Sequence, residues 1–463
     1  MDGIATRSAT VLAAAIRSGE ISSRELLDGY LDRIDRLGPP VNAVVTIDAE
    51  RARAEAAQAD DAAARGNWRG PLHGLPITIK DAIEVGGMRS TGGAVELRDH
   101  VPAADAPAVA RLREAGAIVF GKTNVPRWSG EVQTFNEIFG TTNNPWALDR
   151  VPGGSSGGAA AAVAAGFTSF EIGTDIGGSV RIPAHCCGVF GLKPSFGVVP
   201  QRGYLDHVGG GLTDVDINVF GPIARSADDL ELLLGVLAGP EPERALAWRL
   251  ELPPPRRTGA RDWKVGVWFE TPGVPIDREE LALLRNAADR LADAGAHVED
   301  AHPPIDFDAQ RDLFFTMITA AIAPSMSDDI ADAAAGTHRS WLRADDQRAQ
   351  LAARWAEWFE EYDALLCPVL PVPAFPHQQT ESFLERTLLI NGEVQPHMLL
   401  VGWLGLIGIV DLPSAVAPIG RTPEGLPVGV QVVTPFLRDR DAIALCAAIA
   451  EVSDGGYAVP PGF

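Results

Sequence analysis

Apolar and polar residues alternate along the chain with two different periods, which mark helices and strands. The clearest helical pattern starts with a capping box at Ser22 and continues along one face to residue 34. Similar spacing or composition predicts further helices over residues 48–64, 107–114, 159–165, 227–237 and 278–294. Short apolar runs predict strands over residues 75–79, 117–120, 170–172, 264–268, 364–369 and 428–433. Because helices and strands alternate throughout, we predict an α/β fold.

The length of 463 residues fits either about three domains or one large α/β domain with a broad sheet. Three prolines at 253–255 interrupt the pattern, but they indicate a linker or a surface crossing rather than a clear domain boundary. The longest apolar stretch, residues 398–410, contains three glycines and is too short to span a membrane. We therefore expect it to be buried near a pocket or in the core.

The charge balance narrows the class of partner. The chain carries 39 basic and 61 acidic residues, a net charge of −22, which repels nucleic acid and anionic membranes. Its four cysteines show no CxxC pair or metal-ligand spacing, which predicts buried thiols in a reducing compartment and no metal. The N-terminus shows no secretory pattern. These features predict a cytoplasmic, acidic enzyme without a nucleic-acid or membrane partner.

Two familiar motifs match in spelling but not in context. Residues 116–123 fit the phosphate-loop pattern G-x-x-x-x-G-K-T, yet the intervening residues 117–120 are predicted to be a strand rather than a flexible turn. Residues 153–157 fit the nucleophile elbow G-x-S-x-G, which requires a buried strand directly before it. Residues 148–152 form no such strand, so we reject both interpretations.

Lys80 stands at the end of an apolar strand. A lysine in that position loses hydration, which favours the neutral amine and allows it to act as a general base. Pairing with Asp81 or another carboxylate would instead keep it charged. The local sequence leaves both possibilities open.

Two glycine–serine segments, residues 153–158 and 173–181, follow Lys80 in the chain. In the second segment two glycines precede Ser179, so that consecutive backbone N–H groups can converge on one point. Such a cradle suits the oxyanion of a tetrahedral intermediate. Taken alone, the same pattern also fits two glycine turns with incidental serines.

The lysine and the two glycine–serine segments, in this order, resemble the amidase signature family. The resemblance runs from Gly74 to Pro194 and continues at residues 221–224 and 425–431. It implies one domain over residues 1–463, with a mixed, twisted central sheet flanked by helices and a signature core at 66–230. The least family-like part, residues 240–400, is expected to supply a variable substrate pocket.

The resemblance also implies a Ser–cisSer–Lys triad and no metal or organic cofactor. Ser179 is then the nucleophile, Ser155, with a cis peptide bond, relays its proton, and Lys80 is the base. The implied oxyanion hole consists of the N–H groups of Ile176, Gly177, Gly178 and Ser179. The family usually has threonine in place of Ile176, a change that should be tolerated because only the backbone N–H is needed.

Four further residues receive supporting roles by the same resemblance. Asp175 and Arg181 are expected to form an ion pair that braces the loop. Ser156 is expected to bond nearby backbone or the catalytic lysine. Ser129 matches a position whose backbone faces the substrate in relatives.

The substrate is less well defined than the chemistry. Aromatic and aliphatic residues of the variable region favour an aryl or alkyl amide, and carbamates (urethanes) resemble amides around the scissile carbonyl. No cationic residue is obviously reserved for an anionic substrate, although Arg127 and Arg386 stay candidates. Two alternatives remain: the glutaminase subunit of a tRNA-dependent amidotransferase, and a catalytically silent small-molecule binding protein. The sequence leaves the oligomeric state open.

Overall fold

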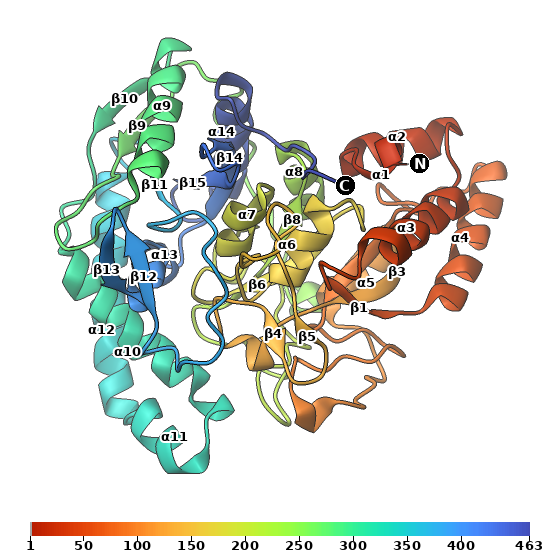
Figure 1. Cartoon of the computed structure of the whole chain (residues 1–463), viewed down its shortest axis with the longest axis horizontal. Coiled ribbons are helices and arrows are strands. Elements are labelled where there is room, and N and C mark those ends of the chain that lie inside the picture. The colour runs from red at the N-terminus through yellow and green to blue at the C-terminus, as the bar shows by residue number, and fades with distance from the viewer. Residues whose placement is uncertain (1) are drawn as a thin grey trace.

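Strands from both halves of the chain pair in one mixed sheet (Figure 1). The computed structural model describes residues 2–463. The strand order is β10-β9-β11-β15-β14-β7-β8-β6, with parallel pairing only among β10, β9 and β11. The strands are β6 (Glu171–Asp175), β7 (Phe190–Lys193), β8 (Val219–Ala224), β9 (Lys264–Val267), β10 (His297–Asp300), β11 (Ala364–Pro368), β14 (Ser414–Arg421) and β15 (Pro427–Val433). The protein is thus a single large α/β domain around this sheet.

Helices cover both faces of the sheet. Helices α8 (Ala227–Leu237), α9 (Arg278–Asp293) and α14 (Asp439–Val452) pack together on one face. Helices α6 (Gly157–Ala164) and α7 (Arg181–Cys187) pack on the other. Every residue of α6 is buried, which explains why this segment is apolar all round rather than amphipathic.

A second, three-stranded sheet carries Lys80. Its order is β1 (Val44–Ile47), β3 (Ile118–Thr123), β2 (Pro76–Lys80), and it packs near α3 (Ser23–Leu37) and α4 (Ala49–Ala64). Strand β2 lies beside β6 of the large sheet, so the ends of these two strands meet. Helices α1 (Asp2–Ala5), α2 (Ala9–Ser18) and α5 (Pro107–Glu114) complete this half.

The second half adds a helical layer beside the large sheet (Figure 1). It contains α10 (Phe307–Ile322), α11 (Asp328–Ala335), α12 (His338–Trp358) and α13 (Gly402–Gly408), together with the hairpin β12 (Thr387–Ile390) and β13 (Glu393–Pro396). A smaller hairpin, β4 (Phe135–Asn136) and β5 (Gly140–Thr141), lies in the first half. Helix α13 is fully buried, as the glycine-containing apolar stretch predicts.

The predicted helices and strands are confirmed to within a few residues, and the two motif rejections hold. Gly121, Lys122 and Thr123 continue β3 instead of forming a phosphate loop. A nucleophile elbow would require a strand directly before Ser155, and residues 151–154 form none. All four cysteines are free and buried. No helix within residues 2–463 is long and apolar enough to cross a bilayer.

Candidate active site

Lys80 reaches the first glycine–serine segment from the end of β2. Its side chain is fully buried, and its Nζ lies 2.6 Å from Ser155 Oγ and 2.8 Å from Thr174 Oγ1. Burial lowers the pKa of Lys80 well below its usual value, although Asp175 and Glu171 oppose this shift. A buried amine with a lowered pKa, in contact with a hydroxyl, is suited to accept a proton.

The other possibility for Lys80, an ion pair with Asp81, is not what the structure contains. The carboxylate of Asp81 accepts hydrogen bonds from the backbone N–H and the hydroxyl of Thr91. Its other oxygen lies 3.9 Å from Lys122 Nζ. Lys122 therefore partners Asp81, and Lys80 faces the serines.

The two glycine–serine segments lie against each other. The peptide bond between Gly154 and Ser155 is cis. The N–H of Ser156 donates to the carbonyl of Ser179 at 3.1 Å, which ties the loop before α6 to the loop before α7. The hydroxyl of Ser156 contacts the backbone N–H and carbonyl of Thr174, at 3.3 and 3.4 Å. Ser156 therefore holds backbone in place, while Ser155 meets the lysine.

The backbone before Ser179 offers N–H groups at the cavity. The N–H of Gly178 donates to Asp175 Oδ1 at 2.9 Å. The N–H groups of Ile176, Gly177 and Ser179 have no hydrogen-bond acceptor within residues 2–463, since the pairing of β6 with β8 ends at Asp175. Gly178 has a φ of +107°, and a Cβ there would lie 2.4 Å from Leu404, so only glycine fits this turn.

Asp175 and Arg181 form the predicted ion pair beneath this loop. Both side chains are fully buried and approach to 2.8 Å. Burial alone would raise the pKa of Asp175, but Arg181 and backbone N–H groups bring it down to about 2. Arg181 also donates to Gln431 Oε1 and to the carbonyl of Leu404, at 2.9 and 3.1 Å. The pair thus connects the loop to β15 and α13.

A cavity of about 430 Å³ opens over Ser179. Ser179 is 7% exposed, whereas Lys80 and Ser155 are fully buried below it. The walls come from the loop around Ser129, the loop from 204 to 215, α10 and the segment before α13. The lining is largely apolar and includes Trp128, Ile176, Tyr204, Val215, Phe314, Phe315, Ile318, Phe383, Leu384, Met398 and Val401. Such a pocket suits an apolar substrate.

Ser129 belongs to this wall. It and the preceding Trp128 both have positive φ values, 55° and 53°. The Oγ of Ser129 is buried near the hydroxyl of Tyr204, and this contact partly opposes the rise in the pKa of Tyr204 that burial causes. Both residues line the cavity, so their hydroxyls are natural contacts for a polar atom of the substrate.

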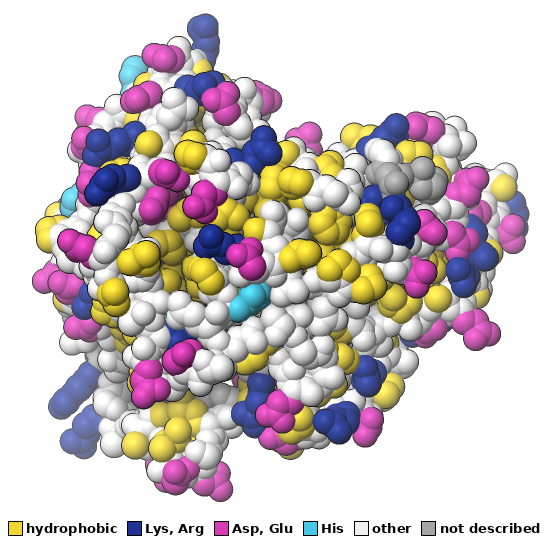
Figure 2. Space-filling view, in the orientation of Figure 1, with side chains coloured by type: hydrophobic (Ala, Val, Ile, Leu, Met, Phe, Trp, Pro, Cys, Tyr) yellow, Lys and Arg dark blue, Asp and Glu magenta, His cyan; other side chains and the backbone are white. Residues whose placement is uncertain are grey.

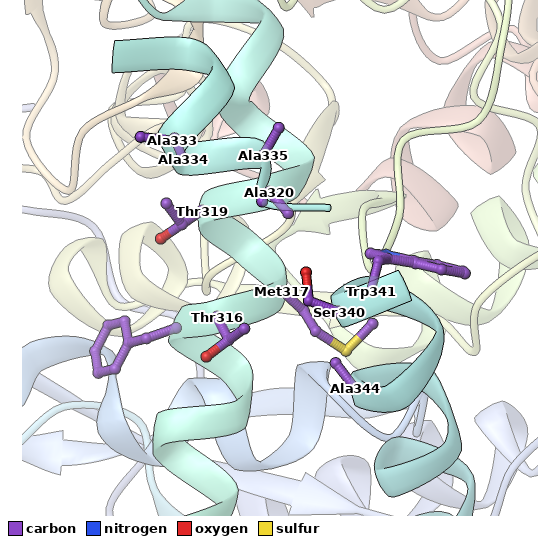
Figure 3. Close-up of a pocket in the computed structure, with 12 residues that line it drawn as sticks. Thr316, Met317, Thr319, Ala320, Ala333, Ala334, Ala335, Ser340, Trp341 and Ala344 are labelled. Carbon is purple, nitrogen blue, oxygen red and sulfur yellow. The ribbon is translucent and has the colours of Figure 1, made fainter. Parts of the chain in front are cut away.

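A second cavity, about 380 Å³, lies between α10, α11 and α12 (Figure 3). Its walls include Met317 of α10 and Trp341 of α12, and Figure 3 shows Met317 extending from α10 toward Ala344 of α12. It shares Phe315 and Thr319 with the catalytic cavity, so α10 separates the two. None of the residues predicted for catalysis lines it.

The aromatic residues of the variable region therefore divide between several roles. Trp355 and Trp403 are fully buried in the core, and Leu389 is exposed on the β12–β13 hairpin.

The two candidate arginines are both paired with carboxylates. Arg386 contacts Glu131 Oε2 at 2.5 Å, and Arg127 pairs with Glu96 at 2.7 Å. Neither arginine lines the catalytic cavity. On the face shown in Figure 2, acidic and basic side chains are interspersed.

Sequence reasoning missed a buried polar network around the lysine. Thr174 on β6 holds Lys80 Nζ, and the only hint was its place in the Gly173–Ser179 segment. Glu171 on the same strand bonds Thr123 at 2.9 Å, and burial raises its pKa to about 7. Burial also lowers the pKa of Lys122 to about 8. Within the described residues, no group of His, Cys, Asp and Glu is arranged to hold a metal ion.

Comparison with known proteins identifies the family. The family model described as Amidase matches residues 25–341 and 305–443. An indoleacetamide hydrolase of Bradyrhizobium diazoefficiens is 35% identical, over 96% of this chain and 86% of that protein. A component of the glutamyl-tRNA(Gln) amidotransferase of a Roseiflexus species is 33% identical, over 96% of both chains. The crystal structure of a bacterial aryl acylamidase superposes with a TM-score of 0.84 at 28% identity, covering 96% of each chain.

The fold and the family match define an amide-hydrolysing enzyme. The chain belongs to the amidase signature family.

Proposed function

We propose that this enzyme hydrolyses aryl or alkyl carboxylic amides through a seryl acyl-enzyme. The observation that carries the proposal is the 2.6 Å contact between the buried Lys80 amine and Ser155, beneath an apolar cavity lined by Ser179. The similarity to a protein named as an indoleacetamide hydrolase and to an aryl acylamidase supports an aromatic substrate.

In the proposed reaction, Ser179 Oγ attacks the carbonyl carbon. Its proton passes to Ser155 Oγ, and the proton of Ser155 passes to the neutral Lys80. The N–H groups of Ile176, Gly177 and Ser179 stabilise the oxyanion. The N–H of Gly178 can do so only after its hydrogen bond to Asp175 Oδ1 breaks.

The C–N bond then breaks, and the leaving nitrogen takes the proton that Lys80 returns through Ser155. Water then attacks the acyl carbon while Lys80 accepts one of its protons through Ser155. The ester bond to Ser179 Oγ breaks, Lys80 returns the proton through Ser155 to that oxygen, and the carboxylic acid leaves.

A hydrolysis panel with the isolated chain tests the substrate class. We expect anilides and arylacetamides to be hydrolysed with the highest kcat/KM, because the cavity wall is apolar and aromatic. Carbamates of the same aryl groups form the second arm, and glutamine forms the third. A preference for glutamine would favour a role as the glutaminase subunit of an amidotransferase. If none of the three groups of substrates were hydrolysed, the silent binding protein would be favoured.

The pH dependence of hydrolysis should report the titration of Lys80. Lys80 must be neutral to accept a proton, and burial lowers its pKa well below its usual value. We therefore expect kcat/KM to fall as the pH drops through this lowered pKa and to reach a plateau below the ordinary lysine pKa. Circular dichroism at each pH shows whether the fall in kcat/KM reflects titration of Lys80 or unfolding of the protein. A rate that climbs without a plateau to the ordinary lysine pKa, about 10.4, would contradict a neutral Lys80.

A further inference from the structure

One carboxylate interrupts the apolar wall of the catalytic cavity. Asp206 lies on the loop that follows Tyr204, and its side chain lines the cavity while remaining only 16% exposed. Its Oδ1 lies 2.8 Å from His207 Nδ1. An ionised carboxylate offers about four acceptor positions, so this contact leaves acceptor capacity for a ligand.

The other carboxylate at the cavity is already neutralised. Glu131 Oε2 contacts Arg386 Nη1 at 2.5 Å, and its Oε1 accepts the N–H of Val132 at 2.9 Å. Asp206 has no arginine or lysine partner among the ion pairs of the described residues. Its negative charge therefore faces apolar walls, and within residues 2–463 only the His207 side chain and the backbone N–H groups of residues 206 and 207 interact favourably with it.

Burial of such a group has a cost that a ligand can reduce. Partial burial raises the pKa of Asp206, and the neighbouring His207 partly opposes the rise. A carboxylate in an apolar cavity gains most from a hydrogen-bond donor that replaces lost water. An apolar group placed there instead would remove the remaining hydration without compensation.

We propose that Asp206 determines substrate specificity by binding a hydrogen-bond donor, an amine or hydroxyl, carried on the apolar body of the amide. This inference rests on the proposed function, because it assigns a selectivity to the same cavity. The substrate class is an aromatic amide with a second, donor-bearing polar group away from the scissile carbonyl. An aryl amide carrying an additional carboxylate would be repelled.

Six phenylacetamides of matched size, with three different ring substituents, test the proposal. They carry aminomethyl, hydroxymethyl or ethyl on the ring, each as the meta and the para isomer. For the wild-type enzyme at mildly alkaline pH, we expect kcat/KM to be about 10 to 100 times higher for the better aminomethyl isomer than for the ethyl compound, with hydroxymethyl between them. In Asp206→Asn and Asp206→Ala this ratio should collapse to within about threefold.

Asp214→Asn is the matched control. Asp214 lies on the same loop, is exposed and does not line the cavity, so its loss should leave the ratio intact. Equal wild-type rates for all three groups, or a preference that survives in both Asp206 variants, would overturn the role of Asp206. Failure of the proposed function looks different, because then none of the six amides would be hydrolysed by the wild-type enzyme.

Discussion

Replacing Ser179 with alanine is expected to lower kcat for amide hydrolysis by at least about 10,000-fold, because no acyl-enzyme can form. The fold should be little affected, since this change removes one hydroxyl at the cavity floor and Ser179 is 7% exposed. Steady-state kinetics with an anilide and a thermal melt measure the two effects separately. Wild-type enzyme quenched during turnover should also carry the acyl group on the peptide that contains Ser179.

The control for Ser179→Ala is Ser195→Ala. Ser195 is a fully buried serine whose hydroxyl and N–H both bind Asp439, at 2.8 and 2.7 Å. Its replacement should cost about 1–3 kcal/mol of stability while kcat stays near the wild-type value. If Ser179→Ala kept its activity, or if the acyl group were found on Ser155, the assigned order of nucleophile and relay would be wrong.

Signals that act locally along the chain show where sequence reasoning works well. Helices α3 (Ser23–Leu37) and α4 (Ala49–Ala64) form because capping and apolar periodicity act locally, and both are visible in the sequence. The lysine and the two glycine–serine segments could be recognised because their spacing and order are specific, although each segment alone was ambiguous. The position of Lys80 at a strand end follows from the apolar run before it.

Contacts that depend on tertiary packing were beyond the sequence. Thr174 meets Lys80 only because β2 and β6, almost a hundred residues apart, lie side by side. Apart from its place in the Gly173–Ser179 segment, no local pattern distinguishes Thr174 from other strand threonines. Asp206 sits on a loop without periodicity, so nothing in its neighbourhood predicts that it faces a cavity.

The same limit applies to the aromatic residues. Hydrophobicity is identical for a core residue and a cavity wall, so Trp403 and Phe314 cannot be separated by composition. The difference lies in what α10 and α13 pack against. The pairing of Lys122 with Asp81, which leaves Lys80 to the serines, is likewise set by the register of β2 and β3.

Replacing Arg181 with methionine should be among the most destabilising single changes near the site, at about 3–5 kcal/mol. Asp175 would then remain as a buried charge without its cation, while the contacts to Gln431 and Leu404 would also be lost. Because the folded-state pKa of Asp175 is about 2, below its unfolded value, this pair stabilises the fold at pH values above about 4, and that stability is lost as the pH falls toward 2. Denaturant unfolding at neutral pH measures the cost.

Arg7→Met provides the comparison, because Arg7 and Glu20 also approach to 2.7 Å but are 39% and 52% exposed. That surface pair should contribute at most about 1 kcal/mol. The double variant Asp175→Asn with Arg181→Met should recover part of the loss, since it removes both buried charges together. An Arg181→Met enzyme as stable as Arg7→Met would show that the buried pair does not brace the loop. A stable but inactive Arg181→Met enzyme would instead show that Arg181 acts by orienting the backbone N–H groups before Ser179 toward the oxyanion.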